Sequence, residues 1–526
     1  MTDRFETTSA IGGERMKTAV GIDKLRLKYP GDERLLFRDL SISVYEGQKV
    51  LLIGPSGCGK STLLQVMAGL IPRAVDVPMS CERAVIPERS AYVFQDPDSQ
   101  FCMPYVDEEI AFVLENVRVP RAEMPERIER LLAAVGLVLP HPHTPIASLS
   151  QGMKQRLAVA CALALEPDVL FVDEPTALID PEGTRQVWET IKTVSGGKTV
   201  VIVEHKIEHI VDYADRIVLF NPRGEIAADG PANVVLADCR SLLDEYGIWY
   251  PGVWDEYVRR RRFSAAAVGP GAESAHRPAA SQAVPAAGTT AAECRIELDD
   301  FAAYRGKAKK LHASWAAAGE GEWIAVVGQN GAGKSTLLLA LAGLLRTTGR
   351  YRLYGRDAAG YGDLSKELAF VFQNPEFQFV THSVYDEIAF DLRADNVSPE
   401  EVREKTETLL AEFGLQDHRN RHPYHLSLGQ KRRLSVASAI VREQQILLLD
   451  EPTFGQDAKN TFALLERLER RRQSGATIVM VTHDPEIVRH FATRVWHVEQ
   501  GRLREVEPER SRRAEDAERE EVAAWS

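Results

Sequence analysis

Two loops of the sequence have the residue types that bind phosphate. Residues 54–62 read GPSGCGKST and residues 328–336 read GQNGAGKST, so both match the pattern GxxxxGK[ST]. Each loop follows an apolar stretch typical of a strand and precedes one typical of a helix. The glycines let backbone N–H groups turn towards phosphate oxygens at the positive end of that helix. The sequence therefore predicts two phosphate-binding loops (P-loops) for a nucleoside triphosphate.

The charged and hydroxyl residues of each loop have separate expected roles. Lys60 and Lys334 would place a positive charge beside the β- and γ-phosphates, and Ser61 and Ser335 would present hydroxyls to Mg²⁺. The predicted ATP-binding residues of the two loops are Gly54, Pro55, Ser56, Gly57, Cys58, Gly59, Lys60, Ser61 and Thr62, and Gly328, Gln329, Asn330, Gly331, Ala332, Gly333, Lys334, Ser335 and Thr336.

Acidic pairs end two further apolar strands. Asp173 and Glu174 follow the run VLFV, and Asp450 and Glu451 follow the run ILLL. The carboxyl edge of a parallel sheet is where such folds bind ligands. We expect each aspartate to hold Mg²⁺ directly or through water, and each glutamate to accept a proton from the attacking water or to orient it. Adjacent acids at a strand end are also common surface residues, but the P-loop earlier in each copy favours the catalytic interpretation.

Two glutamines and two histidines complete the chemistry. Gln95 and Gln373 follow short apolar strands, from where a mobile loop can bring them to the metal or the water. His205 and His483 end strands 32 and 33 residues after the aspartates and could donate to the γ-phosphate. The predicted catalytic residues are Glu174, Glu451, His205, His483, Gln95 and Gln373, and the predicted metal ligands are Ser61, Gln95, Asp173, Ser335, Gln373 and Asp450.

These residues belong to one internal repeat. Gly54 and Gly328 are 274 residues apart, three more motifs recur in the same order within four residues of that offset, and a fifth motif follows them in both copies. The chain is therefore expected to hold two homologous domains, at 18–245 and 293–506. The recurring pairs are VFQDPDSQF and VFQNPEFQF, LSQGMKQR and LSLGQKRR, FVDEPT and LLDEPT, and IVEHK and VTHDP.

Two segments lie outside the repeated domains. Residues 246–292 are expected to be a flexible linker, because Ala, Pro, Gly and Ser dominate them from about residue 263 onwards. Residues 507–526 form a charged tail with no core-forming face, which predicts an exposed helix or a disordered end.

Composition narrows the possible classes of protein. With 526 residues, 44% of them apolar, the chain is long enough for more than one core. Its formal charge of −12 argues against a broad nucleic-acid surface, and its six cysteines include no CxxC pair, so no disulfide framework or iron–sulfur cage is expected. No apolar run approaches the ~20 residues of a membrane helix, and no secretory signal is recognised. Apolar strands without polar alternation predict an α/β fold with a mainly parallel sheet.

The ordered set of motifs resembles the ATP-binding cassette (ABC) family. The resemblance implies two tandem P-loop ATPase domains, each with a mainly parallel sheet, an antiparallel β subdomain and a helical subdomain. It also implies that two cassettes meet head to tail around two ATP molecules, with the signature LSxGx of each facing the P-loop of the other. Ser427 and Gly429 would then complete the first site, and Ser150 and Gly152 the second.

Two details of the resemblance need separate mention. Tyr29 and Tyr304 match the aromatic residue that stacks on adenine in this family, although a tyrosine there is equally typical of core or edge packing. The first signature reads LSQGM, so Met153 replaces the usual glutamine. Both sites keep their glutamate and histidine, and both are predicted to hydrolyse ATP.

The sequence around Gln95 and Gln373 resembles the ATPases of energy-coupling factor (ECF) importers. This implies a peripheral ATPase on the cytoplasmic face of the cell membrane. It would drive uptake of a vitamin, a vitamin precursor or a transition metal through a membrane coupling subunit and a substrate-binding membrane subunit. The loops at about 96–112 and 374–390 would dock the membrane subunit, or else merely cover the sheet. The transported substrate is not encoded in this chain.

A soluble tandem cassette protein acting on the ribosome is the alternative. Such proteins also lack membrane helices, but they join their cassettes by a long, charged, helical linker. Here the linker is rich in Ala, Pro and Gly and the chain is acidic, which favours the importer and predicts no nucleic-acid partner.

Overall fold

The computed structural model describes residues 17–30, 34–177, 179–267 and 294–506, with backbone only for 262–267. The chain divides into two compact units. The first comprises Met1–Val253 with Asp457–Lys459, and the second comprises Trp254–Gln456 with Asn460–Ser526. Each unit contains one copy of the repeat, as the sequence predicts.

The first unit is built on a six-stranded sheet in the order β10-β9-β3-β8-β7-β6. All pairs are parallel except β10 with β9. Every residue of β7 and β8 is buried, which explains why these strands lack polar alternation. A smaller antiparallel sheet places β1 between β2 and the short strands β4 and β5. The strands are β1 (Thr18–Leu27), β2 (Phe37–Tyr45), β3 (Lys49–Ile53), β4 (Met79–Ser80), β5 (Arg83–Val85), β6 (Ser90–Val93), β7 (Val169–Asp173), β8 (Thr199–Val203), β9 (Arg216–Phe220) and β10 (Ile226–Pro231).

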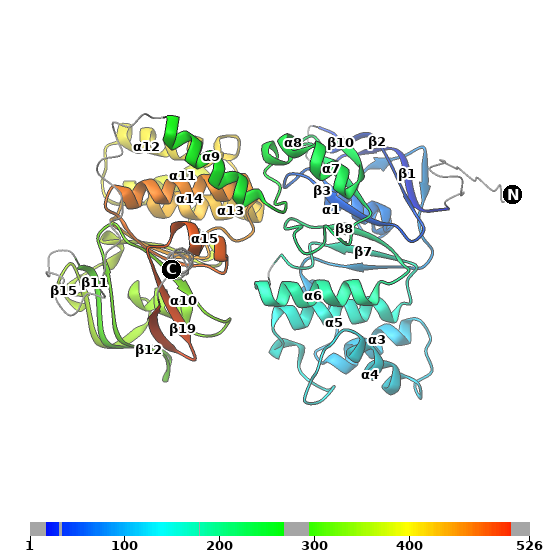
Figure 1. Cartoon of the computed structure of the whole chain (residues 1–526), viewed down its shortest axis with the longest axis horizontal. Helices are drawn as coiled ribbons and strands as arrows, with labels where there is room; N and C mark the ends of the chain where they lie inside the picture. The colour runs from blue at the N-terminus through cyan, green and yellow to red at the C-terminus, as the bar shows by residue number, and fades with distance from the viewer. Residues whose placement is uncertain (1–16, 31–33, 178, 268–293, 507–526) are drawn as a thin grey trace, which may run out of the picture. The chain divides into compact units, whose positions relative to one another are not determined.

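Helices lie on both sides of this sheet. Figure 1 shows α3–α6 below β7 and β8, and α1, α7 and α8 above them. Helix α6 begins where Asp180 accepts a hydrogen bond from the N–H of Gly183 and Pro181 occupies the first helical turn. The helices are α1 (Lys60–Met67), α2 (Leu70–Arg73), α3 (Val106–Asn116), α4 (Met124–Ala134), α5 (Gln151–Ala164), α6 (Pro181–Val194), α7 (Ala232–Asp238) and α8 (Arg240–Glu245).

The second unit joins the corresponding strands into one ten-stranded sheet. Its order is β15-β14-β11-β12-β20-β19-β13-β18-β17-β16, and the parallel pair β12–β20 connects the antiparallel strands to the parallel core. The expected α/β class is confirmed in both units. The strands are β11 (Cys294–Arg305), β12 (Ala308–Gly319), β13 (Trp323–Val327), β14 (Arg346–Leu353), β15 (Arg356–Asp357), β16 (Leu368–Val371), β17 (Ile446–Asp450), β18 (Thr477–Val481), β19 (Arg494–Glu499) and β20 (Arg502–Val506).

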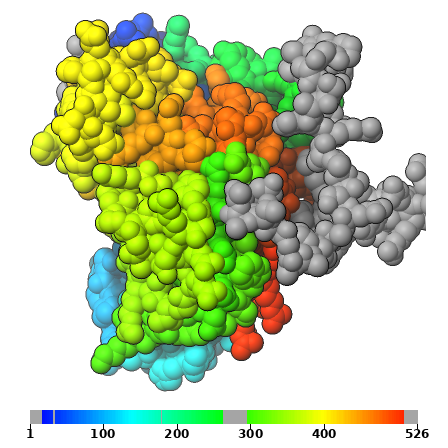
Figure 2. Space-filling model, turned by 90° about the vertical axis from the view of Figure 1, so that its left-hand side faces the viewer, coloured from blue at the N-terminus to red at the C-terminus, as the bar shows by residue number. Residues whose placement is uncertain are grey.

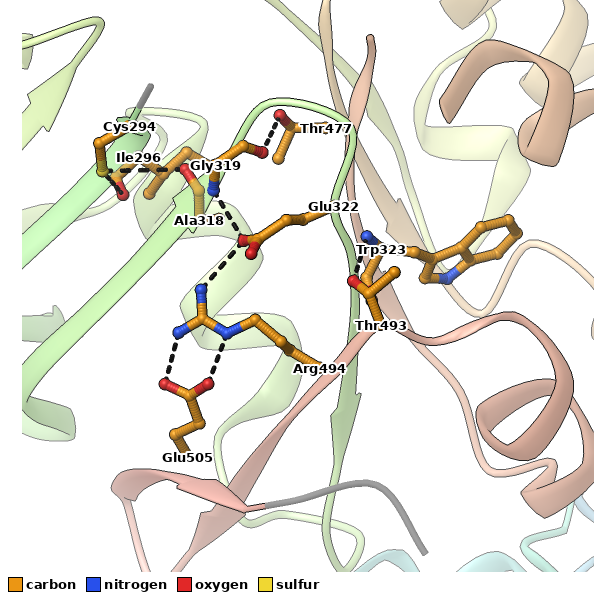
Figure 3. A network of polar contacts seen from close by, with 10 residues as sticks. All are labelled: Cys294, Ile296, Ala318, Gly319, Glu322, Trp323, Thr477, Thr493, Arg494 and Glu505. Atoms are coloured by element: carbon orange, nitrogen blue, oxygen red, sulfur yellow. Dashed lines mark hydrogen bonds and ion pairs between the residues drawn. The ribbon is translucent and has the colours of Figure 1, made fainter. Parts of the chain in front are cut away.

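A polar network fixes the start of β13, the strand that leads to the second P-loop (Figure 3). Glu322 accepts hydrogen bonds from the N–H of Gly319 at 2.7 Å and from Arg494 at 2.9 Å. Arg494 also makes a two-pronged ion pair with Glu505. The Trp323 N–H donates to the Thr493 hydroxyl at 2.8 Å. Because these groups come from β12, β13, β19 and β20, they hold the base of the strand in register.

Four helices of the second unit, between residues 384 and 473, lie together on its surface. Figure 2 shows this stretch in yellow and orange above the green stretch that includes β11 and β12. No helix in the described part of the chain is long and apolar enough to cross a membrane. The helices are α9 (Val253–Ala267), α10 (Lys334–Leu341), α11 (Val384–Ala394), α12 (Pro399–Glu412), α13 (Leu428–Ile440), α14 (Ala458–Gln473) and α15 (Pro485–Phe491).

Helix α9 differs from the sequence expectation, because it lies within the segment 246–292 that was interpreted as flexible. Its side chains pack on α14 and α15 of the second unit. Trp254 meets Phe462 edge-on at 4.9 Å between ring centroids and stacks with His490 at 5.8 Å. Tyr257 stacks on Phe462 at 4.2 Å. Two aromatic residues three positions apart share one face of a helix, and this local signal was hidden by the Ala- and Pro-rich residues that follow. Residues 268–293 and the charged tail 507–526 lie outside the described residues.

We expect Trp254→Ala to destabilise the second unit by about 3 kcal/mol, because it removes a buried aromatic side chain and leaves a cavity. Unfolding of the full chain in urea would measure the change. Trp315, which is 58% exposed, provides the matched control, and Trp315→Ala should change the free energy of unfolding by less than about 0.5 kcal/mol. Equal effects of the two substitutions would contradict the packing role of α9.

Candidate active sites

The P-loop of the first unit connects β3 to α1. Gly59 caps α1 with a φ of 101°, a conformation that favours glycine, and a Cβ there would lie 2.7 Å from the ring of Phe37. Gly57 also has a positive φ, of 83°, but a Cβ there would meet nothing within 4 Å. The second unit repeats both features at Gly331 and Gly333 between β13 and α10. The left-handed glycines therefore give each loop its shape, and the space beside Gly57 and Gly331 is open.

The P-loop lysines fold back over their own loops. Lys60 donates to the carbonyls of Gly54 and Pro55 at 2.8 and 2.9 Å. Lys334 donates to those of Gly328 and Gln329 at 2.8 and 3.0 Å. Both lysines are buried. Each ammonium group is thus held inside a ring of backbone at the start of a helix, which suits a phosphate.

The Asp173 carboxylate of the first site is fully engaged. Ser61 donates to its Oδ1 at 2.8 Å and Tyr92 donates to its Oδ2 at 2.7 Å. Burial raises the pKa of Asp173, and the two hydrogen bonds oppose that shift. Ser61 and Asp173 are brought together as predicted from the sequence, whereas Tyr92 was not among the predicted residues. Comparison of the two copies could have drawn attention to Tyr92, because the equivalent residue of the second copy is Phe370, which lacks the hydroxyl.

Glu174 is held by the other two predicted residues of the first site. Gln95 donates to its Oε2 at 2.9 Å, and His205 Nε2 lies 2.9 Å from its Oε1. Burial raises the pKa of Glu174 and the neighbouring His205 lowers it, and the net direction is downward. Glu174 also has a φ of 44°, a strained conformation for a residue other than glycine. The carboxylate is therefore ionised, positioned and strained, as expected of a general base.

The second site gathers the equivalent residues with looser contacts. Gln373 Nε2 lies 3.5 Å from Glu451 Oε1, and His483 Nε2 lies 3.4 Å from the same oxygen. Glu451 has the same backbone strain, with a φ of 50°. Burial raises the pKa of Asp450 to about 6, against a hydrogen bond from Ser335. Asp450 Oδ1 is buried and finds no hydrogen-bond partner among the described residues, which is a position that a cation would satisfy.

The signature residues begin helices on other elements of each unit. Ser150 caps α5, where its hydroxyl accepts the N–H of Met153 at 3.3 Å. Ser427 caps α13 through a reciprocal pair of bonds with Gln430. Met153 cannot make the return bond that Gln430 makes, so the departure noted in the first signature removes one cap hydrogen bond. Gly152 and Gly429 lie in the first turns of the same two helices.

The two tyrosines have different surroundings. The Tyr29 hydroxyl lies 3.0 Å from that of Thr62, so this ring is beside the first P-loop. The Tyr304 ring lies under the guanidinium of Arg346, at 5.4 Å from the ring centroid. Adenine stacking by Tyr29 and Tyr304 stays a prediction.

The helix that carries each signature also contacts the loop after β6 or β16. Gln155 on α5 donates to the carbonyl of Phe94 at 3.0 Å. Arg432 on α13 donates to the carbonyls of Phe372 and Gln373. Both side chains are buried, and burial lowers the pKa of Arg432 to about 10. Gln155 and Arg432 were not predicted from the sequence, because a polar residue within a helix does not show which distant segment it will contact.

Comparison with known proteins identifies the family. A family model described as "ABC transporter" matches residues 37–177 and 314–454. The chain belongs to the ABC transporter family. The two matches include both P-loops, both signatures and both acidic pairs, so this is an ATP-binding protein and an ATPase with two cassettes in one chain.

Curated relatives carry the same tandem of ABC cassettes. The chain is 36% identical over 493 residues to a Bacillus subtilis protein named "Putative HMP/thiamine import ATP-binding protein YkoD", covering 90% of this chain and 88% of the relative. It is 31% identical over 522 residues to a Methanosarcina mazei "Putative ABC transporter ATP-binding protein", covering 92% and 88%.

A solved structure supports the fold of this ABC ATPase. It contains the archaeal ribosome recycling factor aABCE1 bound to the ribosomal stalk protein aP1, and it matches with a TM-score of 0.59. The match covers 91% of this chain and 89% of that chain, at 22% identity. At this identity the likeness concerns the tandem-cassette fold alone.

Proposed function

We propose that this ABC ATPase is the energy-coupling subunit of an ECF-type importer. It would lie on the cytoplasmic face of the membrane and drive uptake of a vitamin, a vitamin precursor or a transition metal. The observation that carries the proposal is the similarity over 90% of the chain to a protein named as an import ATP-binding protein. A coupling subunit and a substrate-binding subunit, both in the membrane, are the partners in this proposal.

Each nucleotide site in this proposal takes its signature from the other cassette. The first would combine its P-loop with Ser427 and Gly429, and the second would use Ser150 and Gly152. The exposed positions of Ser150 and Ser427 at the N-termini of α5 and α13 support this assignment, because the positive end of a helix suits a triphosphate. Two ATP molecules would then draw the cassettes together, and hydrolysis would release them.

Mg²⁺ fits the donor set of both sites. Ser61 and Asp173 would hold it in the first site, and Ser335 and Asp450 in the second, with Gln95 and Gln373 within the same clusters. The buried, unpartnered oxygen of Asp450 supports this assignment. When bound, the ion neutralises charge on the β- and γ-phosphates.

The residues of this chain would perform the hydrolytic step by positioning and proton transfer. Lys60 places its charge at the phosphates, and Glu174 accepts a proton from the attacking water. Gln95 and His205, which both contact Glu174, orient its two oxygens. His205 would also donate to the γ-phosphate and so respond to its loss. The second site would use the equivalent residues.

The surface around residues 374–390 supports docking of a membrane subunit. Phe377 is 75% exposed and Val380 is 64% exposed, and Tyr424 beside them is 47% exposed. Large apolar side chains that gather on a surface mark interaction sites. The loop at 96–112 would provide the docking surface of the first cassette.

Purification of the full chain from detergent-solubilised membranes would test the partners. We expect integral membrane subunits to co-purify and ribosomes to be absent. Phe377→Asp should reduce the recovered membrane subunits, because it places a charge on the apolar docking surface. Val138→Asp is the matched control, since Val138 is 90% exposed at a different place in the chain. Recovery of ribosomes without membrane subunits would overturn the proposal in favour of a ribosomal factor.

A further inference from the structure

A buried carboxylate behind the first site is not used by the chemistry described above. Glu204 follows β8 and directly precedes His205. Its Oε1 accepts the backbone N–H of His205 at 2.8 Å, and its Oε2 accepts the hydroxyl of Thr176 at 2.7 Å. Thr176 comes two residues after Glu174. The side chain of Glu204 therefore bridges the loop of the proposed base to the loop of the histidine.

The second cassette has no such bridge among its described residues. Thr482 occupies the position of Glu204, and its hydroxyl accepts the N–H of Asp484 at 3.1 Å, within its own loop. The histidine lies 3.4 Å from the glutamate in this site, against 2.9 Å in the first. The glutamine lies at 3.5 Å, against 2.9 Å. The cassette that has the Glu204 bridge is therefore also the one with the shorter glutamate–histidine and glutamate–glutamine distances.

We infer that Glu204 is a positioning residue that holds His205 and Glu174 in one rigid arrangement, and that it makes the first site differ from the second. The inference rests on the roles proposed for Glu174 and His205. Glu204 hydrogen-bonds His205 and Thr176, neither of which belongs to the P-loop, so it acts through these two partners.

The charge of Glu204 adds a second property to the bridge. Its carboxylate is fully buried and faces Glu174 and His205, and burial raises its pKa to about 7. A carboxyl with a raised pKa stabilises the fold while it is protonated. That contribution is complete below about pH 4.5, the ordinary value, and is lost as the pH rises through about 7.

The test uses the full chain with the second site silenced by Glu451→Gln, so that turnover reports the first site. Glu204→Thr introduces the residue of the second cassette and removes the bridge. We expect it to lower kcat about 10-fold while the KM for ATP changes less than about twofold, because the base and histidine are misplaced but the P-loop is intact. Glu204→Gln keeps a carbonyl acceptor for the His205 N–H and offers an N–H to the Thr176 hydroxyl, which can accept instead of donating, so kcat should stay within about threefold of the parent.

The pH dependence separates positioning from simple packing. Glu204→Gln removes an ionisation near pH 7, so its kcat profile should lose any step there, and its thermal midpoint should exceed that of the parent by more at pH 8 than at pH 5. If folded Glu204→Thr keeps the parental kcat, or if the Gln variant falls as far as the Thr variant, the inference is wrong. Glu174→Gln in the same background is the reference. If that variant also keeps full turnover, it is the proposed function of the site that fails.

Discussion

Replacing Glu174 by Gln is expected to lower ATP turnover at the first site by about 10²–10⁴-fold, the usual effect of losing a general base. The pKa of Glu174 is lowered, so the carboxylate is ionised, and Gln95 and His205 hold it. Its backbone is strained, with a φ of 44°. Gln preserves the shape but cannot accept a proton. Phosphate release under single-turnover conditions, with ATP binding measured in parallel, would separate chemistry from affinity.

The same change at Glu451 should lower turnover at the second site by a comparable factor, because the residue has the same strain and the same neighbours. The chain carrying both substitutions should retain ATP binding and lose hydrolysis. Glu129 is an exposed glutamate on α4, so Glu129→Gln serves as the matched control with full turnover expected. Full activity of either single variant in a chain whose other site is silenced would refute the role of that glutamate.

Most of the site could be predicted from sequence, because its chemistry depends on short motifs that fold locally. The positive φ angles of Gly57 and Gly59 give the P-loop much of its shape from within its own motif. The acidic pairs were equally clear, since apolar strands that end in Asp and Glu place them at one edge of a parallel sheet. The internal duplication then distinguished the residues that recur in both copies from the other polar residues of the chain.

The residues that sequence reasoning missed make contacts between distant segments. Tyr92 and Asp173 are 81 positions apart, and Thr176 and Glu204 are 28 apart. Nothing in a local pattern shows that a tyrosine on one strand will meet an aspartate at the end of another. These residues could have been found only where the two copies differ, because Phe370 and Thr482 replace them in the second cassette.

Helix α9 was missed for another reason. The low complexity of the segment after it dominated the composition of the whole stretch, whereas the helix packs through the aromatic residues Trp254 and Tyr257 near its start. Composition averaged over a window therefore obscured a short amphipathic element at its edge. The packing of α9 on α14 and α15 makes it a structural part of the second unit.

The asymmetry of the two sites follows from these same differences. In the first site Tyr92 donates a hydrogen bond to Asp173, and Glu204 accepts the backbone N–H of His205. In the second site Asp450 keeps a buried oxygen without a partner, and burial raises its pKa to about 6. The proposed cation would therefore displace an existing hydrogen bond at Asp173 but fill an open position at Asp450. This difference lies in the residues that the repeat does not preserve, although the motifs themselves are intact in both copies.

Substitution of Lys60 or Lys334 by Ala should lower turnover at the altered site by about 10²–10³-fold, the effect of removing one charge-stabilising donor. Each lysine is buried and held by two loop carbonyls, so no other described side chain of its loop can supply a positive charge there. The loss should differ from that of the glutamate variants, because ATP affinity should also fall. Equilibrium binding of ATP and phosphate release, measured on the same preparations, would show both effects.

The double variant tests whether ATP hydrolysis by this chain powers transport. With Lys60 and Lys334 both replaced by Ala, neither cassette can hold the triphosphate, and cells that express it with the membrane subunits should lose energy-dependent uptake. Lys366→Ala, which removes an exposed charge outside both P-loops, should leave turnover and uptake unchanged. Persistent uptake by the double variant would mean that another ATPase powers the importer. If the double variant loses ATP turnover but no transport activity of the cells changes, this ATPase does not power a membrane importer.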